Sequence, residues 1–496
     1  MKTFEDLIAF CKPISVTGTA PNGLGKLCQD SRKVEAGDLF IAVKGYTVDG
    51  HNFIDKAIEN GASVIISEKP VELRSGISVV VVKNTRVLLG PLAQTMVGYP
   101  AKKLTVIGIT GTNGKTTVAT LIWQALTNLG EKVSLLGTVE KRINEKSVES
   151  RLTTSDPIEL AEDMKEMVEA GSRYVVMEVS SHALHQHRVE GIPFYVAVFT
   201  NLSLDHLDYH QSMDEYAEAK KLLFDSLETF DWAITNLDDP KGEWIISDTE
   251  ARILNFSFDG KGNISAEILK EDETGTTLLV EGTELHTPLI GRFNAYNIVE
   301  ALLACTVLGI DGKHCAEALE KCIGAPGRME RVNNPEKLDH QPLVLVDYAH
   351  TPDALENVSK TLFDLKKPEQ NLIILFGCGG DRDKTKRSEM AKIAEKYGDY
   401  VMVTSDNPRT EDPESIIKDI HMGFSDLTKV SSITSREDAI KKVINDADSN
   451  SIVLIAGKGH ETYQEVNGKR HHFDDREIAR KALDSRNGHP KNSEVA

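Results

Sequence analysis

Short apolar runs that end in polar turns recur along the chain, and they alternate with segments whose apolar residues lie three or four positions apart. The clearest runs lie at 104–110, 174–179, 195–200, 343–346, 372–376, 400–404 and 452–455. Runs of this length are typical of buried strands, and the spacing between them is typical of amphipathic helices. The alternation predicts an α/β fold with mainly parallel sheets that helices cover on both faces.

The length of the chain predicts more than one domain, because its 496 residues exceed what a single hydrophobic core usually serves. We expect a small N-terminal α/β domain, a central mononucleotide-binding domain and a C-terminal Rossmann-like domain at 1–97, 98–327 and 328–496. The strands expected in the first of these lie at 38–44, 62–67 and 78–82. A linker is predicted at 98–100, and the last residues, from 485, are expected to form a disordered tail.

One loop between an apolar run and a helical pattern has the composition of a phosphate-binding loop. Its residues are Gly111, Thr112, Asn113, Gly114, Lys115, Thr116 and Thr117. Backbone N–H groups at the start of a helix face an anion, a lysine adds a charge, and a following hydroxyl can bind Mg²⁺. The general pattern would place its first glycine at Ile109, so this is a compressed form of the loop. A chance Gly-rich turn is the alternative, and the flanking strand and helix argue against it.

Composition and charge limit the partners and the compartment. The net charge of −19 argues against nucleic acid and anionic membranes as partners. No window approaches the ~18 apolar residues of a membrane span, and Glu5 and Asp6 stand where a signal peptide needs apolar residues. The six cysteines form no C-x-x-C pair, so we expect buried thiols in a reducing cytoplasm.

Polar residues follow the predicted strands of the central domain, where ligands of parallel sheets usually bind. Glu178 could share Mg²⁺ with Thr116, although a lone strand-end glutamate is usually solvated. His206 and His210 lack the H-E-x-x-H pattern of zinc sites, which leaves His206 as a ligand of a second Mg²⁺ or as a structural imidazole.

Two further groups in the central domain have no catalytic pattern of their own. Ser180-Ser181-His182 lacks the G-x-S-x-G elbow of hydrolases, so we interpret these residues as hydrogen-bond donors to a substrate. Lys220 lies on a helix predicted at 213–226, which Ser212 and Glu215 open as a capping box. By position alone it would be a solvated helix lysine.

Four polar loops follow the predicted strands of the C-terminal domain. They lie at 347–350, 377–382, 406–409 and 457–461. Loops after parallel strands converge on one edge of a sheet, so they predict a second ligand pocket. A protein that only switches with its nucleotide does not need such a pocket.

Seven motifs occur in one order along the chain: G-T-N-G-K-T-T, M-E-V-S-S-H, D-H-L-D-Y-H, Y-A-E-A-K, G-R-M-E, D-Y-A-H-T-P and D-N-P-R. Together they resemble the Mur ligases, the ATP-dependent amide-bond-forming enzymes of peptidoglycan synthesis, over nearly the whole chain. The folate-polyglutamating relatives typically have Gly-Ser after the loop lysine, whereas Thr116-Thr117 stand here. The chain departs from the pattern at Leu152, where relatives often have Asn.

The resemblance implies a role for each matching residue. The UDP-sugar would bind at Ser31, Tyr46, Thr47 and Val48. The muramoyl-dipeptide would bind at Thr153, Thr154, Ser180, Gln186 and Arg188. ATP would lie among the phosphate-loop residues, Asn294, Arg328, Asp347 and His350. Magnesium would be held by Thr116, Glu178, His206 and Lys220, the last as a carbamate, and catalysis would rest on Lys115, Lys220 and His206. The incoming amino acid would bind at Arg382, Asp406, Asn407, Pro408, Arg409, Gly457 and Glu461.

The implied reaction adds meso-diaminopimelate to the D-glutamate of UDP-N-acetylmuramoyl-L-alanyl-D-glutamate through an acyl phosphate, in the cytoplasm and by a monomer. Arg409 favours diaminopimelate, because its guanidinium suits the distal carboxylate that L-lysine lacks. An ordinary surface pair between Arg409 and Glu411 is the alternative for this residue. For the function, the alternatives are an L-lysine-adding ligase and a nucleotide-dependent switch that does not ligate.

Overall fold

The computed structural model describes residues 1–46, 48–72, 74–144, 146–207, 209–333 and 341–486. It divides into two compact units. The first comprises residues 1–266, 280–283 and 297–319, and the second comprises 267–279, 284–296 and the chain from 320 onward. The main sheets have five, eleven and six strands. This arrangement confirms the predicted α/β class with mainly parallel sheets.

The N-terminal part of the first unit is a five-stranded sheet with strand order β1-β5-β4-β3-β2. Its strands are β1 (Ser15–Gly18), β2 (Leu27–Cys28), β3 (Leu39–Ile41), β4 (Val64–Ser67) and β5 (Ser78–Val81). Its helices are α1 (Phe4–Cys11), α2 (Ile54–Glu59) and α3 (Thr85–Met96). The three predicted strands are confirmed. Strand β1 is exposed along its length, so it lacks the apolar signal that would have predicted it.

The central sheet has the order β16-β15-β14-β13-β12-β11-β6-β10-β7-β8-β9. Parallel strands form its middle: β6 (Thr105–Thr110), β7 (Val133–Leu136), β10 (Tyr174–Glu178), β11 (Phe194–Phe199), β12 (Trp232–Asn236) and β13 (Arg252–Ser257). An antiparallel hairpin, β8 (Glu140–Ile143) and β9 (Lys146–Glu149), extends one edge. Strands β14 (Ile264–Asp272), β15 (Gly275–Val280) and β16 (Thr283–Thr287) follow β13.

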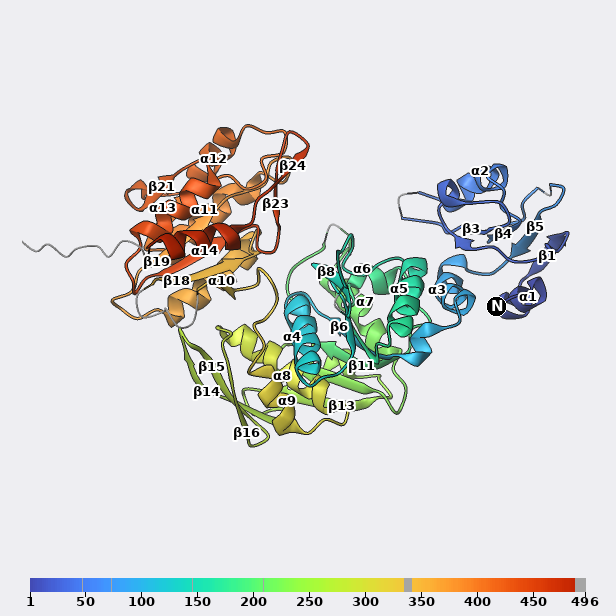
Figure 1. Cartoon of the computed structure of the whole chain (residues 1–496), viewed down its shortest axis with the longest axis horizontal. Coiled ribbons are helices and arrows are strands. Elements are labelled where there is room, and N and C mark those ends of the chain that lie inside the picture. Colours follow the sequence, from blue (N-terminus) through green and yellow to red (C-terminus); the bar gives the residue numbers. More distant parts are fainter. Residues whose placement is uncertain (47, 73, 145, 208, 334–340, 487–496) are drawn as a thin grey trace, which may run out of the picture. The chain divides into compact units, whose positions relative to one another are not determined.

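Helices of the central part carry or support the polar loops. They are α4 (Lys115–Asn128), α5 (Pro157–Glu169), α6 (Ser181–His185), α7 (Met213–Asp225), α8 (Arg292–Thr306) and α9 (Gly312–Leu319). Helix α4 packs on β6, β7 and β10 (Figure 1). Ser212 caps α7 by accepting a hydrogen bond from the Glu215 N–H, whereas the Glu215 carboxylate accepts from the N–H of Gln211. The predicted helix is therefore confirmed, with its reciprocal bond shifted by one residue.

The sheet of the second unit has the order β17-β18-β22-β19-β20-β21. Its strands are β17 (Glu330–Arg331), β18 (Leu343–Asp347), β19 (Leu372–Phe376), β20 (Tyr400–Val403), β21 (Val430–Ser432) and β22 (Ile452–Ala456). All except β17 are parallel to their neighbours. Apolar clusters lie on both faces of this sheet. The four strands predicted here are confirmed.

The helices of the second unit are α10 (Pro352–Leu365), α11 (Thr385–Tyr397), α12 (Pro413–His421), α13 (Arg436–Asp446) and α14 (Asp475–Arg486). A separate hairpin is formed by β23 (Tyr463–Val466) and β24 (Lys469–His472). The predicted tail begins too early, because Ser485 and Arg486 still belong to α14. Residues 487–496 lie outside the described part of the chain.

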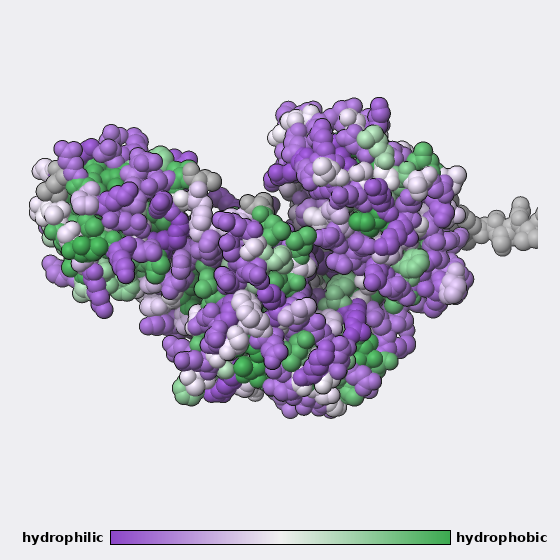
Figure 2. Space-filling view, turned by 180° about the vertical axis from the view of Figure 1, so that it is seen from behind, coloured by the Kyte–Doolittle hydropathy of each residue, from purple (hydrophilic) through white to green (hydrophobic). Residues whose placement is uncertain are grey.

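The surface shown in Figure 2 is mainly hydrophilic, and the cysteines are free thiols, as the sequence predicts. On the face shown in Figure 2, hydrophilic residues cover most of the surface and hydrophobic residues form small separate groups. Within the described residues, every helix is too short or too polar to span a bilayer. The six cysteines are free thiols, and all except Cys28 are buried.

Candidate functional site

The phosphate loop of the first unit has the geometry that its sequence predicts. It joins the end of β6 to the start of α4, and Gly111 and Gly114 have φ angles of 149° and 85°. A Cβ atom at Gly111 would collide with the hydroxyl of Thr200. Side chains after β11 hold the loop, because Asn201 accepts a hydrogen bond from the Asn113 N–H at 3.0 Å. The loop therefore presents its backbone at a helix N-terminus, as an anion site requires.

Lys115 and Lys220 converge on one carbonyl group of this loop. The Nζ of each donates a hydrogen bond to the carbonyl oxygen of Gly111 at 2.8 Å. Lys220 is only 1% exposed, and its ammonium lies 4.3 Å from the ring centroid of Tyr216. Burial, and then the nearby charge of Lys115, hold the pKa of Lys220 well below its ordinary value. The solvated position expected from the helix pattern alone is therefore wrong.

Glu178 is buried beside Thr116, as the strand-end prediction requires. The Thr116 hydroxyl donates to Glu178 Oε2 at 3.0 Å, and the carboxylate is only 1% exposed. Thr138 adds two bonds, from its N–H to Oε1 at 2.8 Å and from its hydroxyl to Oε2 at 3.0 Å. Thr138 is not among the predicted site residues, although it stands just after the strand β7, as other site residues stand just after their strands.

His206 lies within a group of aromatic and imidazole rings. Its ring centroid is 5.0 Å from that of His182 and 5.8 Å from that of Tyr216. The backbone at His206 has a φ angle of 55°. Among the described residues, there is no group of three His, Cys, Asp or Glu side chains arranged to hold a metal ion. Of the predicted magnesium ligands, Thr116 and Glu178 are joined by a hydrogen bond, and Lys220 and His206 both lie beside the ring of Tyr216.

The residues predicted to hold the muramoyl-dipeptide form one hydrogen-bonded chain. Arg188 donates to Gln186 Oε1 at 2.7 Å and to the Thr154 carbonyl at 3.0 Å. Thr154 Oγ1 donates to the Glu178 carbonyl at 2.8 Å and accepts from the Ser180 N–H at 3.1 Å. Thr153 joins the group through its hydroxyl, which accepts from that of Thr138 at 3.1 Å. Burial lowers the pKa of Arg188, which nevertheless stays a cation.

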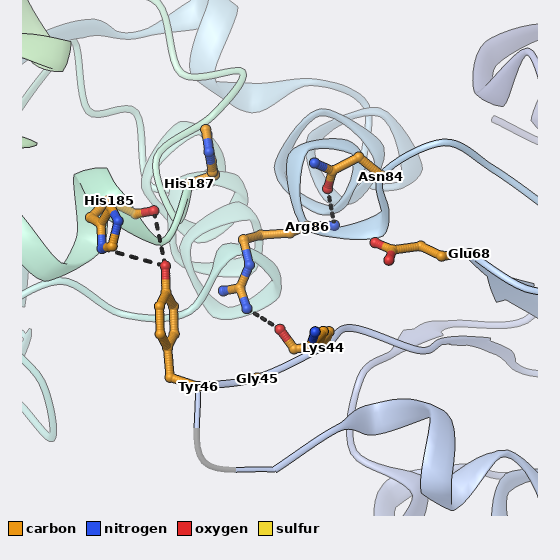
Figure 3. Close-up of a pocket in the computed structure, with 8 residues that line it drawn as sticks. All are labelled: Lys44, Gly45, Tyr46, Glu68, Asn84, Arg86, His185 and His187. Atoms are coloured by element: carbon orange, nitrogen blue, oxygen red, sulfur yellow. Dashed lines mark hydrogen bonds between the residues drawn. The ribbon is translucent and has the colours of Figure 1, made fainter.

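A pocket of about 560 Å³ lies next to these hydrogen-bonded residues in the first unit (Figure 3). It is lined by Lys44, Gly45, Tyr46, Glu68, Asn84, Arg86, His185 and His187. The guanidinium of Arg86 lies 4.8 Å from the ring centroid of Tyr46 and donates to the Lys44 carbonyl (Figure 3). Four of the lining side chains are basic or imidazole groups in a strongly acidic protein. The pocket therefore suits an anionic ligand.

The predicted UDP-sugar residues are only partly placed at this pocket. Tyr46 lines it, and its hydroxyl lies 3.4 Å from His185 Nδ1. Ser31 is buried and is not among the lining residues, and Val48 is exposed. Thr47 lies outside the described residues. Arg86, His185 and His187 are not among the predicted site residues, because none of them stands in a polar cluster after a predicted strand.

In the second unit, three of the predicted ATP residues lie beside β17 and β18: Arg328 precedes β17, and Asp347 and His350 stand at and just after the end of β18. Asp347 accepts backbone hydrogen bonds from Met329 at 2.7 Å and Ala349 at 2.8 Å. Burial raises the pKa of Asp347, and the charge of Arg328 opposes this rise. The Arg328 guanidinium lies 4.8 Å from the ring centroid of Tyr348, and His350 Nδ1 lies 2.9 Å from the Tyr348 carbonyl.

Asn294 and His460 also belong to the second unit. Asn294 donates from Nδ2 to the Ile290 carbonyl at 2.8 Å and is 2% exposed. His460, which the sequence analysis did not single out, stacks on Tyr348 with centroids 4.9 Å apart. Burial, and then the charge of Arg328, lower the pKa of His460 to about 4. It is therefore a neutral ring at physiological pH.

The residues predicted to hold the amino acid also lie together in the second unit. Arg409 donates from Nη1 to the Gly380 carbonyl at 2.7 Å, and its Nε lies 3.9 Å from Glu465 Oε2. Arg409 and Arg382 both approach Gly379, and Gly457 lies against the Asp406 carboxylate. Asn407 Nδ2 donates to Glu461 Oε2 at 2.8 Å. Pro408 lies between Asn407 and Arg409 and is buried.

The alternative partner considered for Arg409 is engaged elsewhere. Glu411 accepts hydrogen bonds from the buried guanidinium of Arg387, at 2.8 Å from Nη2 to Oε1, and pairs with Lys384 at 3.2 Å. A surface pair between Arg409 and Glu411 is therefore wrong.

Comparison with known proteins identifies relatives of the whole chain. Sequence models match in three parts: Mur ligase family, catalytic domain (residues 26–95), Mur ligase middle domain (109–305) and Mur ligase, glutamate ligase domain (327–459). The chain is 41% identical to the UDP-N-acetylmuramoyl-L-alanyl-D-glutamate–2,6-diaminopimelate ligase of Cytophaga hutchinsonii, over 97% of this chain and 99% of that protein. It is 44% identical to that of Geobacillus thermodenitrificans, over 92% and 94%. A solved structure of a ligase with the same name matches with a TM-score of 0.74 and 35% identity, covering 99% of this chain and 100% of the other.

Proposed function

The chain belongs to the Mur ligase family, and we propose that it is the ATP-dependent ligase that joins meso-diaminopimelate to the D-glutamate of UDP-N-acetylmuramoyl-L-alanyl-D-glutamate. The observation that carries this proposal is the similarity, over nearly the full length, to 2,6-diaminopimelate ligases that are about 40% identical. The reaction belongs to peptidoglycan synthesis, and we propose that it takes place in the cytoplasm with the protein as a monomer.

The phosphate loop supports the use of ATP. Lys115 lies within hydrogen-bond distance of the loop, and from there its ammonium can offset charge on the phosphoryl oxygens. The hydroxyl of Thr116 and the carboxylate of Glu178 are the hard oxygen donors that Mg²⁺ prefers, and they lie 3.0 Å apart. When bound there, Mg²⁺ would neutralise negative charge on the transferred phosphoryl group. His206 and the ATP roles of Asn294, Arg328, Asp347 and His350 stay predictions.

Lys220 fits a magnesium site only after modification. As an ammonium it is a cation beside Lys115, and it would repel a metal ion. Burial favours its neutral amine, whose nitrogen can attack carbon dioxide. This forms a carbamate and releases one proton. The carbamate would carry a negative charge and two oxygen atoms, and it would add a second ligand of this kind to the carboxylate of Glu178.

The proposed chemistry solves the problem that a carboxylate is a poor acyl donor. The D-glutamyl γ-carboxylate attacks the γ-phosphorus of ATP, the bond to the bridging oxygen breaks, and ADP leaves. The amine of diaminopimelate then attacks the carbonyl carbon of the acyl phosphate, phosphate leaves with the bonding electrons, and the new amide loses a proton. The chain supplies positioning and charge for both steps.

The anionic part of the nucleotide-sugar suits the basic pocket of the first unit. Arg86, Lys44 and the two imidazoles there could balance its charge, and Tyr46 provides a ring and a hydroxyl. The hydrogen-bonded residues Thr154, Gln186 and Arg188 begin beside Glu178, which supports the proposal that they hold the peptide carboxylates near the phosphate loop.

Arg409 supports diaminopimelate over L-lysine. The planar guanidinium is only partly exposed, and its Nε is 3.9 Å from the nearest carboxylate oxygen of Glu465. That separation is too long for a hydrogen bond, so the guanidinium can donate hydrogen bonds to the distal carboxylate of diaminopimelate as a second partner. L-Lysine has no group to place there.

Release of ADP by the purified protein tests the proposal. We expect release only when ATP, UDP-N-acetylmuramoyl-L-alanyl-D-glutamate and meso-diaminopimelate are all present. Release with L-lysine at equal efficiency would favour the lysine-adding alternative. Release that needs neither the nucleotide-sugar nor an amino acid would favour a nucleotide-dependent switch.

A further inference from the structure

Lys458 is a buried charged residue to which the proposed reaction gives no role. It lies between β22 and β23 in the second unit and is 0% exposed. Taking an ammonium group out of water is unfavourable unless partners compensate its charge and satisfy its N–H groups. The partners of this side chain therefore indicate what it does.

The partners of Lys458 come from two different loops. Its Nζ donates to Asn407 Oδ1 at 3.1 Å and to Glu461 Oε2 at 3.0 Å. Asn407 follows β20, and Glu461 follows β22. Both belong to the predicted binding site for the incoming amino acid. One ammonium group thus joins two loops of that site.

The bonds of Lys458 fix how the amide of Asn407 is turned. An ammonium group only donates, so it must face the oxygen of the amide and not the nitrogen. The same Oδ1 also accepts from the N–H of Glu465 at 2.9 Å. With its oxygen held by two donors, the amide points Nδ2 toward Glu461 Oε2, at 2.8 Å.

The carboxylate of Glu461 is held in place by Lys458 and Asn407. Its Oε2 accepts from both Lys458 and Asn407, whereas Oε1 takes no part in these bonds. A carboxylate with one oxygen held in this way presents the other in a fixed direction. The distal ammonium of a diamino acid needs such an acceptor.

The hairpin of β23 and β24 connects this group to Arg409. The Arg409 N–H donates to the Glu465 carbonyl at 3.0 Å, and the Gln464 side chain donates to the Asp406 carbonyl at 2.7 Å. Because the Glu465 N–H also binds Asn407, the loop 406–409 is held by the hairpin and by Lys458 together.

We propose that Lys458 is a positioning residue that sets the orientation of Asn407 and Glu461 for the distal end of the incoming diamino acid. This inference rests on the proposed function. Lys458 itself does not touch the substrate, because its ammonium is enclosed by the two side chains that it orients.

The test uses the full chain with Lys458→Met, which keeps the length of the side chain and removes the donor, and with Lys458→Gln, which keeps a shorter donor. ADP release gives kcat and the KM of each substrate. We expect Lys458→Met to raise the KM for meso-diaminopimelate about 10- to 100-fold, as the loss of hydrogen bonds to a charged group predicts. The KM values for ATP and the nucleotide-sugar should change less than about twofold, and Lys458→Gln should lie between wild type and Lys458→Met.

Lys366→Met is the matched control in the same unit. The Lys366 side chain is 14% exposed, and its Nζ pairs with Asp399 Oδ2 at 2.8 Å, away from the predicted site. We expect this variant to lower the melting temperature and to leave every KM unchanged. An equal rise of all three KM values in Lys458→Met, or an unchanged KM for diaminopimelate, would overturn the proposal.

The test still gives an answer if Lys458→Met does not fold, and it separates the role of Lys458 from the proposed function. If Lys458→Met shows no cooperative melting transition, Lys458→Gln decides, and an unchanged KM for diaminopimelate in that folded variant would contradict the positioning role. If wild-type protein releases ADP without any dependence on diaminopimelate, the proposed function itself fails. If wild type shows that dependence and the variants share its KM, only the role of Lys458 fails.

Discussion

Lys220 and Lys458 are both almost completely buried, and the two units surround them differently. Lys220 donates to a backbone carbonyl, lies over the ring of Tyr216 and has the cation Lys115 nearby. Lys458 donates to a carboxylate and to an amide oxygen. A buried ammonium without a bonded anion favours its neutral, nucleophilic form, whereas one that is bonded to a carboxylate holds that group in place.

Two buried carboxylates of the first unit show the same contrast. Glu178 accepts three hydrogen bonds from Thr116 and Thr138. Glu300 on α8 is 0% exposed, and neither of its oxygens has a hydrogen-bond partner among the described residues. Burial alone therefore does not mark a functional group here. The partners decide whether a buried charge serves a site or weakens the fold.

The largest loss of turnover is expected from replacing Lys115, which shares the Gly111 carbonyl with Lys220. Lys115→Ala should reduce turnover at least about 10²–10³-fold, because a charge aimed at the phosphoryl oxygens is lost. The fold should survive, since the ammonium of Lys115 donates to the carbonyl groups of Gly111 and Thr112, which belong to its own loop. ADP release and a melting curve measure both effects. Near-normal turnover in a folded variant would show that this loop does not bind the reacting phosphates.

Lys220→Ala sharpens the contrast between the two buried lysines. We expect an inactive enzyme that short carboxylates such as acetate or formate partly restore, because they can replace the carbamate oxygens. Lys221→Ala is the control, since Lys221 pairs with Asp225 and Asp248 and should have a mild effect. Full activity of Lys220→Ala would refute the carbamate role. Failure of every carboxylate to restore activity would limit Lys220 to a role in packing.

Arg409→Ala tests whether the second unit selects its substrate by charge. Losing a charge-assisted pair in a closed site should cost about 2–5 kcal/mol, or about 30-fold to a few thousand-fold in kcat/KM for diaminopimelate. Most of the change should appear in KM. Arg470→Ala, an exposed hairpin arginine that lies 4.0 Å over the ring of Tyr463, is the control. An unchanged preference for diaminopimelate in Arg409→Ala would remove the basis for this assignment.

Glu300→Met should give the smallest effect and should stabilise the protein. Burial, and then the charge of Asp239, raise the pKa of Glu300 well above its ordinary value. Because the pKa of Glu300 is higher in the folded protein than in the unfolded chain, its favourable contribution to the free energy of unfolding is complete below the ordinary pKa of a glutamate. That contribution is lost as the pH rises from the ordinary pKa to the pKa of the folded protein. At neutral pH the variant should therefore be more stable by about 1–3 kcal/mol.

Melting temperatures between pH 5 and pH 8 measure this effect. Wild type should lose stability over that range relative to Glu300→Met, because the unfolded chain releases a proton that the folded chain retains. Parallel pH dependences of the two proteins would contradict the account of Glu300. Glu178 offers the opposite case, since removing a carboxylate with three hydrogen bonds should destabilise the phosphate loop.

The sequence predicted the parts of the fold and site that depend on local pattern. Apolar runs gave the central strands, and the order of loop, Lys and Thr gave the phosphate site. Strand-end position brought Glu178 to Thr116, as observed. The exposed strand β1 and the hairpin of β23 and β24 lack such runs, so they were missed.

What the sequence could not supply is pairing between distant segments. The burial of Lys220 depends on the phosphate loop, which is 109 residues away along the chain. Thr138 and Lys458 have partners 40 and 51 residues away, and their positions in loops after strands do not identify those partners. The roles inferred from the family resemblance placed several residues that pattern alone could not, and they stay predictions until each is tested.

The most direct test of the central claim is the mass of the product formed in competition. The protein would be incubated with ATP, UDP-N-acetylmuramoyl-L-alanyl-D-glutamate and equal concentrations of meso-diaminopimelate and L-lysine. We expect the product to carry diaminopimelate, with ADP released in equal amount. A product that carries L-lysine in comparable amount, or ADP release without any extended nucleotide-sugar, would contradict the assignment.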